Sequence, residues 1–580
     1  MRFGTCSRAL LMATAMLASA ETCAFAAAVD SCSWSRDIKL TNGKIITMDS
    51  KNSIVSEVTI QDGKFTAVGK TANQKLSPCT KTIDLKGRTV VPGLIDNHNH
   101  FISLGLRPGY DVRLETAWSI PEIQDRIRTR LKGIPPTAFV TATGGWSPKQ
   151  LAEKRMPTMA ELDAAAPNNP VYIAPTGQGG QLTNSLGKKF FESKGLTVNP
   201  DGTFPGAGGF AGGSAAIGAL RTIQTFEDEK RGMMDAETYS ASLGLTVNLD
   251  QGFFYLEGTP DLQDSRVSGP GIETFSPWTF YDAAVALDRE NKLTSRLRLF
   301  WYTLDTSMDV PILKERLLNN FPLFGDDMLR ISGVGETVVQ NPPPPPGTVA
   351  PRPPGAGGGF RFVPPANEEA ALQLIAKRGY AYSQHSTTLA EDMFITDTFE
   401  KVNKVTPIAN LRWSISHVPK IDEPTLNRLK AMGAGVMAHS WQYLTGNIPP
   451  PGAPPAGPPF RMILDDGIHA GGGSDAVAVT SLDPWLMIYY MVTGKNSAGE
   501  VINPGQQITR MEALRLYTAN NGWFLHEEDK LGSIEPNKLG DLVVLSADYS
   551  DPAKVSDQDI RNIKAVLTVV GGKIVYDDMR

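Results

Sequence analysis

The sequence predicts an α/β protein, in which a parallel β/α barrel is joined to a β-sandwich built from both ends of the chain. Two observations predict this architecture. Residues 37–86 and 541–576 contain short runs in which apolar and polar residues alternate, separated by Asn-Gly, Asp-Gly and Gly-Gly turns, as in β-hairpins. Between them, apolar strand-like runs alternate with helix-length segments, which is typical of a parallel β/α fold.

Eight of the apolar runs in the middle of the chain have the length of barrel strands. They are Leu94–Asn99, Leu245–Asp250, Leu297–Tyr302, Leu329–Glu336, Tyr380–Ser386, Arg412–Val418, Gly435–Ser440 and His469–Asp475. Eight parallel strands, each followed by a helix-length segment, are the content of a (β/α)8 barrel.

The chain has 580 residues, more than one hydrophobic core of ordinary size accommodates, so we expect one large domain with a smaller one, or two domains. The expected parts are a sandwich from residues 30–90 and 527–580, a barrel from 91–526, and an insertion at 106–240 after the first barrel strand. Two proline-rich segments, 341–365 and 447–459, directly follow predicted barrel strands. We expect them on the barrel rim, as surface insertions or as a lid or wall of the pocket.

The charge balance argues against a polyanionic partner. Lys and Arg number 56 against 61 Asp and Glu, which gives a net charge of -5. There is therefore no electrostatic reason to expect nucleic acid or an anionic membrane as partner. We expect a small-molecule substrate, and a homodimer is compatible with the sequence.

Residues 1–26 have the pattern of a cleaved signal peptide. Arg2 and Arg8 form a basic start, Ala9–Ala20 is apolar, and Ala24-Phe25-Ala26 supplies small residues for cleavage. The apolar run is too short to span a bilayer core of about 30 Å, so we expect a periplasmic or secreted protein rather than an anchored one.

Cleavage near Ala26 would leave Cys32 and Cys79 as the only cysteines of the mature chain. An oxidising compartment favours a disulfide between them, and two free thiols are the alternative.

The first barrel strand carries the strongest functional signal. His98 and His100 stand at spacing i, i+2, so an extended strand places both rings on one face. They close an apolar strand in a chain with only seven histidines, which favours a metal site over two solvated rings.

Further polar residues stand at the ends of the other predicted strands, where barrel enzymes gather their catalytic groups. They are Asp250, Glu336, His385, His417, His439 and Asp475. Imidazoles and carboxylates can hold a divalent cation, most readily zinc, that lowers the pKa of a bound water toward about 7. Asp475 can ligate the metal and move the proton of that water to the leaving group, and the glycines before it suggest close approach of substrate to backbone. We expect His439 to line the pocket, and His469 and His526 to be structural or exposed.

Several stretches together resemble the metal-dependent amidohydrolase superfamily, and within it the YtcJ-like (amidohydrolase 3) branch that includes N-substituted formamide deformylases. These stretches are Val91–His100, His385, His417, Gly473–Asp475 and Leu531–Leu542. The resemblance implies a distorted (β/α)8 barrel with an appended β-sandwich, and hydrolysis of non-peptide C–N bonds by a metal-activated hydroxide. It also implies that His98, His100 and Asp475 hold one metal, and that His385 and His417 hold a second metal or the carbonyl oxygen of the substrate.

The sequence departs from the family pattern at the fourth strand, where the branch commonly has a metal-bridging carbamylated lysine. Here the strand reads Ile331-Ser332-Gly333-Val334-Gly335-Glu336, with glycine in the expected position. Either Glu336 supplies a bridging carboxylate, or a single metal is held by His98, His100, Asp475 and His385 while His417 polarises the substrate. The sequence favours the single metal. A second departure is Gly177-Gln178, where the branch commonly has Gly-His.

These residues favour an exported metal-dependent amidohydrolase that acts on a small organic compound. Two alternatives remain. The same kind of site can deaminate a cyclic amidine or a nucleobase-like substrate. The missing lysine also allows a degenerate barrel that binds without turnover, although His98, His100, His385, His417 and Asp475 are all retained.

Overall fold

The computed structural model describes most of the chain between the N-terminal region and the C-terminus. The described residues are 32, 35–70, 75–176, 180–205, 210–252, 279–301, 303, 305–341, 364–476 and 479–579. The predicted signal peptide, Gln178 and most of the first proline-rich segment lie outside them. No described helix is both long enough and apolar enough to cross a membrane.

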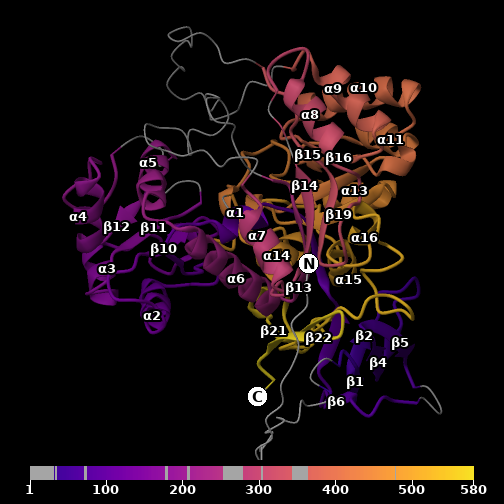
Figure 1. The fold of residues 1–580 in the computed structure, drawn as a ribbon, viewed down its shortest axis with the longest axis horizontal. Helices are drawn as coiled ribbons and strands as arrows, with labels where there is room; N and C mark the ends of the chain where they lie inside the picture. The colour runs from indigo at the N-terminus through magenta and orange to yellow at the C-terminus, as the bar shows by residue number, and fades with distance from the viewer. Residues whose placement is uncertain are drawn as a thin grey trace, which may run out of the picture.

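Eight parallel strands form the central sheet, which confirms the predicted barrel (Figure 1). They are β8 (Leu94–Asn99), β13 (Leu245–Asp250), β14 (Arg296–Trp301), β15 (Leu329–Glu336), β16 (Ala381–His385), β17 (Ser414–His417), β18 (Gly435–His439) and β19 (His469–Gly473). Each strand pairs with the next along the chain. All eight match the predicted runs within two residues at each end, because buried parallel strands need continuous apolar sequence.

The first and last strands meet where the sheet closes. The amide of Asp475 donates to the carbonyl of His98 at 2.8 Å, and the side chain of Asn521 donates to the carbonyls of Ile95 and Gly472. The closure brings residues from opposite ends of the barrel sequence into one site.

Helices surround the sheet (Figure 1). They are α1 (Phe101–Gly105), α6 (Phe226–Leu243), α7 (Asp282–Arg289), α8 (Pro311–Asn319), α9 (Glu368–Lys377), α10 (Leu389–Val405), α11 (Glu423–Ala431), α12 (Gln442–Thr445), α13 (Phe460–Asp466), α14 (Pro484–Thr493), α15 (Arg510–Leu516) and α16 (Asn521–Phe524), with the 3-10 turn η2 (Ala409–Leu411). Capping side chains in the adjacent sequence stabilise the first turns of several of these helices. The Thr388 side chain, for example, caps α10 by accepting from the amide of Glu391.

Strands from both ends of the chain form the sandwich, as predicted. The N-terminal strands are β1 (Ile38–Thr41), β2 (Lys44–Ile46), β3 (Ile54–Val55), β4 (Val58–Gln61), β5 (Lys64–Val68), β6 (Lys81–Asp84) and β7 (Thr89–Pro92). The C-terminal strands are β20 (Leu542–Leu545), β21 (Ala565–Val570) and β22 (Lys573–Asp577), with η3 (Asp557–Asn562) before β21. One sheet has the order β22-β21-β20-β7-β2-β3, so the two ends share a single sheet.

The segment after β8 forms a separate lobe, drawn in purple and magenta on the left of Figure 1. It contains β9 (Tyr110–Asp111), α2 (Ile120–Leu131), β10 (Val140–Thr143), η1 (Pro148–Gln150), α3 (Met159–Ala165), β11 (Val171–Ala174), β12 (Leu182–Thr183), α4 (Ser185–Ser193) and α5 (Phe210–Arg221). The lobe has its own four-stranded sheet and apolar core. The helix α6, inside the expected insertion, packs instead against α1 and α7 of the barrel.

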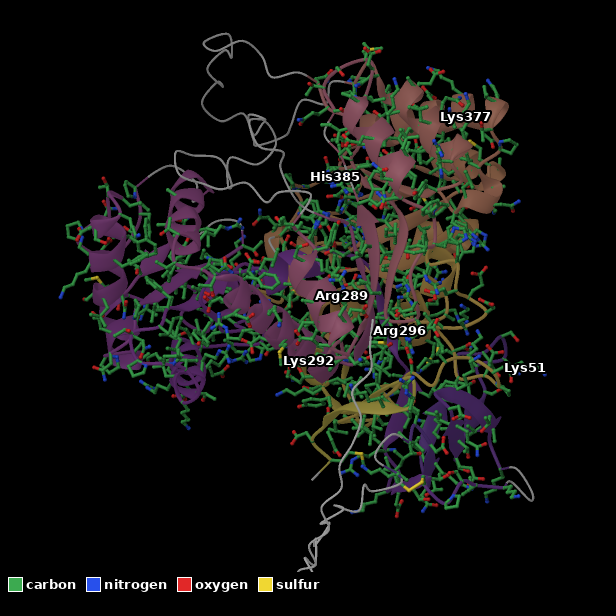
Figure 2. All side chains as sticks on the ribbon, viewed as in Figure 1. Lys51, Arg289, Lys292, Arg296, Lys377 and His385 are labelled. Carbon is green, nitrogen blue, oxygen red and sulfur yellow. A yellow bond between two sulfur atoms is a disulfide. The ribbon has the colours of Figure 1, made fainter. Side chains whose placement is uncertain are left out.

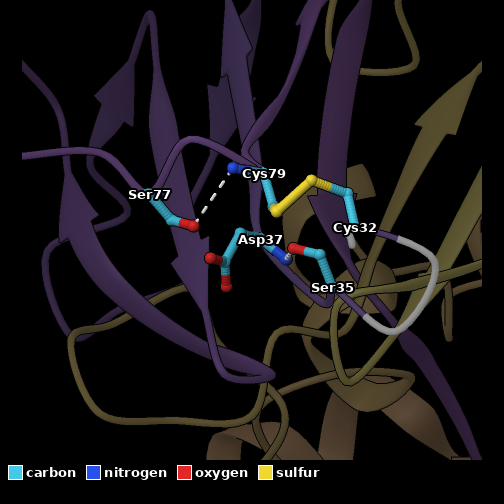
Figure 3. Close-up of a disulfide and its surroundings, with 5 residues drawn as sticks. All are labelled: Cys32, Ser35, Asp37, Ser77 and Cys79. Carbon is cyan, nitrogen blue, oxygen red and sulfur yellow. Dashed lines mark hydrogen bonds between the residues drawn. A yellow bond between two sulfur atoms is a disulfide. The ribbon is translucent and has the colours of Figure 1, made fainter. Parts of the chain in front are cut away.

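A disulfide joins Cys32 to Cys79 across 47 residues, which confirms the pairing favoured by the sequence (Figure 3). The amide of Cys79 also donates to the hydroxyl of Ser77. The disulfide therefore links Cys32, the first described residue, to the segment before β6.

Buried ion pairs lie at the other end of the barrel from His385, where Figure 2 shows Arg296 at the start of β14. Arg296 pairs with Asp541 of the sandwich at 2.8 Å. Arg298 pairs with Glu527 at 2.5 Å, and both side chains are fully buried. Glu527 also accepts from Arg330 at 3.0 Å. These pairs tie the barrel to the C-terminal segment on the face away from the strand ends that carry histidine.

Candidate metal centre

The predicted ligands all lie at the carboxyl ends of barrel strands. His98 belongs to β8 and His100 follows it, while Glu336, His385 and His417 are the last residues of β15, β16 and β17. Asp475 stands two residues beyond β19. Parallel strands end on the same rim of a barrel, which is why residues nearly 400 positions apart converge.

A first group consists of His98, His100 and Asp475, whose ligand atoms lie within 4.8 Å of one another. The Oδ1 of Asp475 is 3.3 Å from Nε2 of His100 and 3.7 Å from Nε2 of His98. Two imidazole nitrogens and one carboxylate oxygen form a common ligand set for a divalent cation.

A second group consists of Glu336, His385 and His417. The Oε2 of Glu336 lies 3.1 Å from Nδ1 of His385 and 3.1 Å from Nε2 of His417. The same oxygen is 3.3 Å from Nε2 of His98, and Oε1 is 3.7 Å from Nε2 of His100. Glu336 therefore belongs to the second group and also faces the two histidines of the first.

The second nitrogen of each histidine on β8 has its own partner. Nδ1 of His100 donates to the carbonyl of Gly252 at 2.5 Å, and Nδ1 of His98 lies 3.1 Å from the hydroxyl of Ser416. Partners of this kind orient metal-binding imidazoles and leave Nε2 for the metal. Nε2 of His98 is buried and has no hydrogen-bond partner among the described residues. This orphaned atom, aimed at Asp475 and Glu336, fits a metal ligand.

Burial and the carboxylates act in opposite directions on these side chains. Burial lowers the pKa of His98 to about 4. It would also lower the pKa of His100 and His385, but the nearby Asp475 and Glu336 raise both to about 9. Burial would raise the pKa of Glu336, but His385 and His417 hold it well below its ordinary value. Glu336 is thus stabilised as a carboxylate by the positive charge of the imidazoles around it.

The two glycines of the fourth strand leave little space for a lysine side chain in their places. A Cβ atom at Gly333 would lie 2.5 Å from the ring of Phe300, and one at Gly335 would lie 2.6 Å from the carbonyl oxygen of Ser383. Neither position has room for a side chain. Glu336 occupies the place between the two groups instead.

The glycines before Asp475 have a packing role that the sequence did not indicate. A Cβ at Gly473 would lie 2.6 Å from Oδ1 of Asn97, and one at Gly471 would lie 2.2 Å from Oδ1 of Asn521. They permit close approach of β8 and α16 to β19, because barrel closure crowds the first strand against the last. Close approach of substrate to the backbone at these glycines stays a prediction.

Three residues that contact the centre were not singled out from the sequence. Ser416 approaches His98, and Asp96 accepts from the amides of His98 and Ser474 at 3.1 Å. Burial raises the pKa of Asp96 to about 6. The third is Gly252, which supplies the carbonyl for His100. Asp96 and Ser416 could have been found only as polar residues inside apolar strands, because Ser474 and His98, which they contact across the barrel, are distant in sequence.

Of the other polar residues at strand ends, Asp250 and His439 lie beside the centre and His469 lies away from it. Asp250 is buried and accepts from the amides of Ile102 and Gly252 at 2.8 Å, so it holds the backbone beside His100. His439 is buried within the cluster, with Nδ1 2.8 Å from Nδ1 of His417. His469 lies at the start of β19, away from the centre, and stacks on the ring of Trp523.

The His385 side chain is 41% exposed, whereas those of His98 and His417 are at most 1% exposed. Figure 2 shows His385 near the upper end of the barrel strands. The centre is therefore exposed to solvent on the side of the second group.

Comparisons with known proteins agree with this geometry. The profile of the amidohydrolase family matches residues 81–247 and 314–576. N-substituted formamide deformylase of Arthrobacter pascens is 22% identical over 601 residues, covering 93% of this chain and 98% of that protein. Putative amidohydrolase YtcJ of Bacillus subtilis is 21% identical over 554 residues, covering 92% and 98%.

Solved structures share the fold. Atrazine chlorohydrolase TrzN from Arthrobacter aurescens TC1, described as complexed with zinc, is similar with a TM-score of 0.54 at 15% identity, covering 94% of this chain and 96% of that chain. An uncharacterized metal-dependent hydrolase from Pyrococcus horikoshii has a TM-score of 0.53 at 18% identity, covering 88% and 98%. The barrel, the histidine and carboxylate groups at its rim and the profile match over most of the sequence lead to one conclusion: the chain belongs to the amidohydrolase family and is a metal-dependent hydrolase of C–N bonds.

Proposed function

We propose that the centre holds two divalent metal ions, most readily zinc, that share Glu336. In this arrangement His98, His100 and Asp475 hold one ion, and His385 and His417 hold the other. The position of Glu336 carries the proposal, because its Oε2 faces three imidazole nitrogens at 3.1 to 3.3 Å. The nitrogen and oxygen ligands suit zinc. His417 then acts as a ligand, rather than as a free group that polarises the substrate.

Divalent ions at this site would supply Lewis acidity, which makes water nucleophilic at neutral pH and polarises a carbonyl. The residues of the chain handle the proton. Asp475 has Oδ1 directed at His100 and Oδ2 3.6 Å from Nδ1 of His417, so its carboxylate lies between both groups. We assign to Asp475 the removal of the proton from the attacking water and its delivery to the departing nitrogen.

The proposed substrate is a small organic compound with an amide-type C–N bond. The similarity to N-substituted formamide deformylase supports this class, because it extends over 93% of this chain and 98% of the relative. We expect such a compound to approach on the side of the second ion, because the His385 side chain is 41% exposed.

The experiment joins metal analysis with a substrate screen. Purified protein is assayed by mass spectrometry for metal content and tested on N-formyl, N-acyl and aryl amides, with purines and pyrimidines as the deaminase panel. We expect two ions per chain and amide cleavage. Ammonia release from the nucleobase panel without amide cleavage would establish a deaminase instead, and a protein with neither metal nor turnover would overturn the catalytic proposal.

A pair of variants isolates the role of Asp475. We expect Asp475→Asn to lower kcat by about 100-fold or more, in the range of general acid–base catalysis. Asp483→Asn is the matched control, because Asp483 is a buried aspartate that caps α14 away from the centre and asparagine caps a helix equally well. Equal activity of the two variants would contradict the assignment.

We propose further that the protein is exported. The signal-like pattern of residues 1–26 and the Cys32–Cys79 disulfide support export, because disulfides persist in oxidising compartments. N-terminal sequencing of the protein from the periplasmic and culture fractions of a Gram-negative expression host tests the proposal. A mature start just after Ala26 is expected, and an intact N-terminus confined to the cytoplasm would refute it.

A further inference from the structure

His439 lies beside the metal centre, where one of its ring nitrogens is within 4.8 Å of nitrogens of His98 and His417. Its ring is fully buried, 4.5 Å from the ring of His417 and 4.2 Å from the ring of His98. Its Nδ1 atom lies 2.8 Å from Nδ1 of His417. The other nitrogen, Nε2, has no hydrogen-bond partner among the described residues.

The short contact between the two histidines fits a hydrogen bond better than a pair of ligands on one ion. Two nitrogens bound tetrahedrally to zinc at about 2.0 to 2.1 Å are separated by roughly 3.3 Å. The distances from Glu336 and Asp475 to the histidines are 3.1 to 3.7 Å, whereas the contact of His439 with His417 is 2.8 Å. That value lies inside the hydrogen-bond range.

The two nitrogens of His417 therefore have different tasks. Nε2 faces Glu336 at 3.1 Å, and Nδ1 faces His439. A neutral imidazole carries one proton, so an Nε2 that binds a metal leaves the proton on Nδ1. That proton needs an acceptor, and the nearer candidate is Nδ1 of His439, since the closest oxygen of Asp475 is 3.6 Å away.

We propose that His439 is a positioning residue for the second metal ion: its Nδ1 accepts the hydrogen bond from Nδ1 of His417 and so fixes the tautomer in which Nε2 of His417 binds the ion. The role parallels the carbonyl of Gly252 beside His100 and the hydroxyl of Ser416 beside His98. A histidine partner differs from these because it is an aromatic ring that also packs against His98.

The inference rests on the proposed two-ion centre, and three variants test it. His439→Leu removes the acceptor, whereas His439→Gln offers an amide oxygen to the same proton. His469→Leu is the matched control, because His469 lies away from the centre against Trp523. Metal content after dialysis is measured by mass spectrometry, and the absorption spectrum is measured after cobalt substitution. Circular dichroism and the Tm verify folding.

Loss of an orienting partner commonly weakens metal binding 10- to 100-fold. We expect His439→Leu to keep one ion per chain, to bind the second 10- to 100-fold more weakly and to lose part of the cobalt spectrum. We expect His439→Gln and His469→Leu to keep two ions. Two tightly bound ions and an unchanged spectrum in His439→Leu would overturn the role of His439 but not the two-ion centre. Equal losses of metal in the leucine and glutamine variants would do the same. A wild-type protein with only one ion would overturn both this role and the two-ion centre.

Discussion

Replacing Glu336 by glutamine removes the negative charge shared by the two metal groups and preserves the size of the side chain. One oxygen of Glu336 lies 3.1 Å from nitrogens of both His385 and His417, and 3.3 Å from that of His98. Two unit charges at this separation interact by about 5 kcal/mol in an effective dielectric of 20. Because the amide oxygen of glutamine keeps part of this attraction, we expect a net loss of about 3 kcal/mol, or roughly 100-fold in affinity for each ion.

Chelator competition measures this loss directly. Wild-type and Glu336→Gln proteins are titrated against a metal indicator, the bound ions are counted, and kcat/KM is measured on the best amide substrate. Glu368→Gln is the matched control, because Glu368 is a buried glutamate on α9 outside the centre. If Glu336→Gln weakens only one ion, Glu336 is a ligand of that ion and not a bridge. If it keeps both ions within tenfold of wild-type affinity, the reasoning from the position of Glu336 is refuted.

Three further predictions concern stability. Arg298→Met should destabilise the barrel by about 3 kcal/mol in urea unfolding, because it leaves the buried Glu527 with Arg330 as its remaining partner. Cys32→Ser should destabilise the sandwich by roughly 2 to 4 kcal/mol, since the disulfide closes a loop of 47 residues. Burial would raise the pKa of Asp548, but Lys44 and other donors lower it from 3.8 to about 2. The ionised carboxylate therefore contributes fully to the free energy of unfolding above pH 3.8, and this contribution is lost as the pH falls through 2. We therefore expect the free energy of unfolding of Asp548→Asn to fall by about 1 kcal/mol less than that of the wild type on acidification. This value allows for solvent screening at the partly exposed Lys44.

Each of these predictions has an outcome that contradicts it. For the ion pair, the double variant Arg298→Met with Glu527→Leu should recover part of the lost stability. A double variant less stable than Arg298→Met would be inconsistent with an uncompensated buried charge. For the disulfide, equal unfolding midpoints with and without a reductant would count against the assigned stabilisation. For Asp548, parallel stability curves of the variant and the wild type between pH 4 and 2 would show that the carboxylate pairs no better in the folded state than in the unfolded chain.

The strands of the barrel could be predicted from the sequence because each is a local apolar run of the right length. β8 and β13, for example, match the predicted bounds fully, and the i, i+2 spacing of His98 and His100 follows from the strand period alone. The sandwich strands likewise followed from alternation and turn residues. Local patterns of this kind are enough to name candidate ligands one strand at a time.

The relations between the strands were decided only by the tertiary structure. Asp96 meets Ser474 across 378 residues, and no local pattern announces that contact or the crowding that requires Gly473. The same holds for the position of Glu336 between two histidine groups, where the sequence alone favoured a single metal. The sequence by itself determined which strands exist and which polar residues end them, because strand formation depends on neighbouring residues. Barrel closure decided which of those residues meet at one rim and which, like His439, lie next to a proposed ligand, because these contacts join residues that approach one another only in the folded chain.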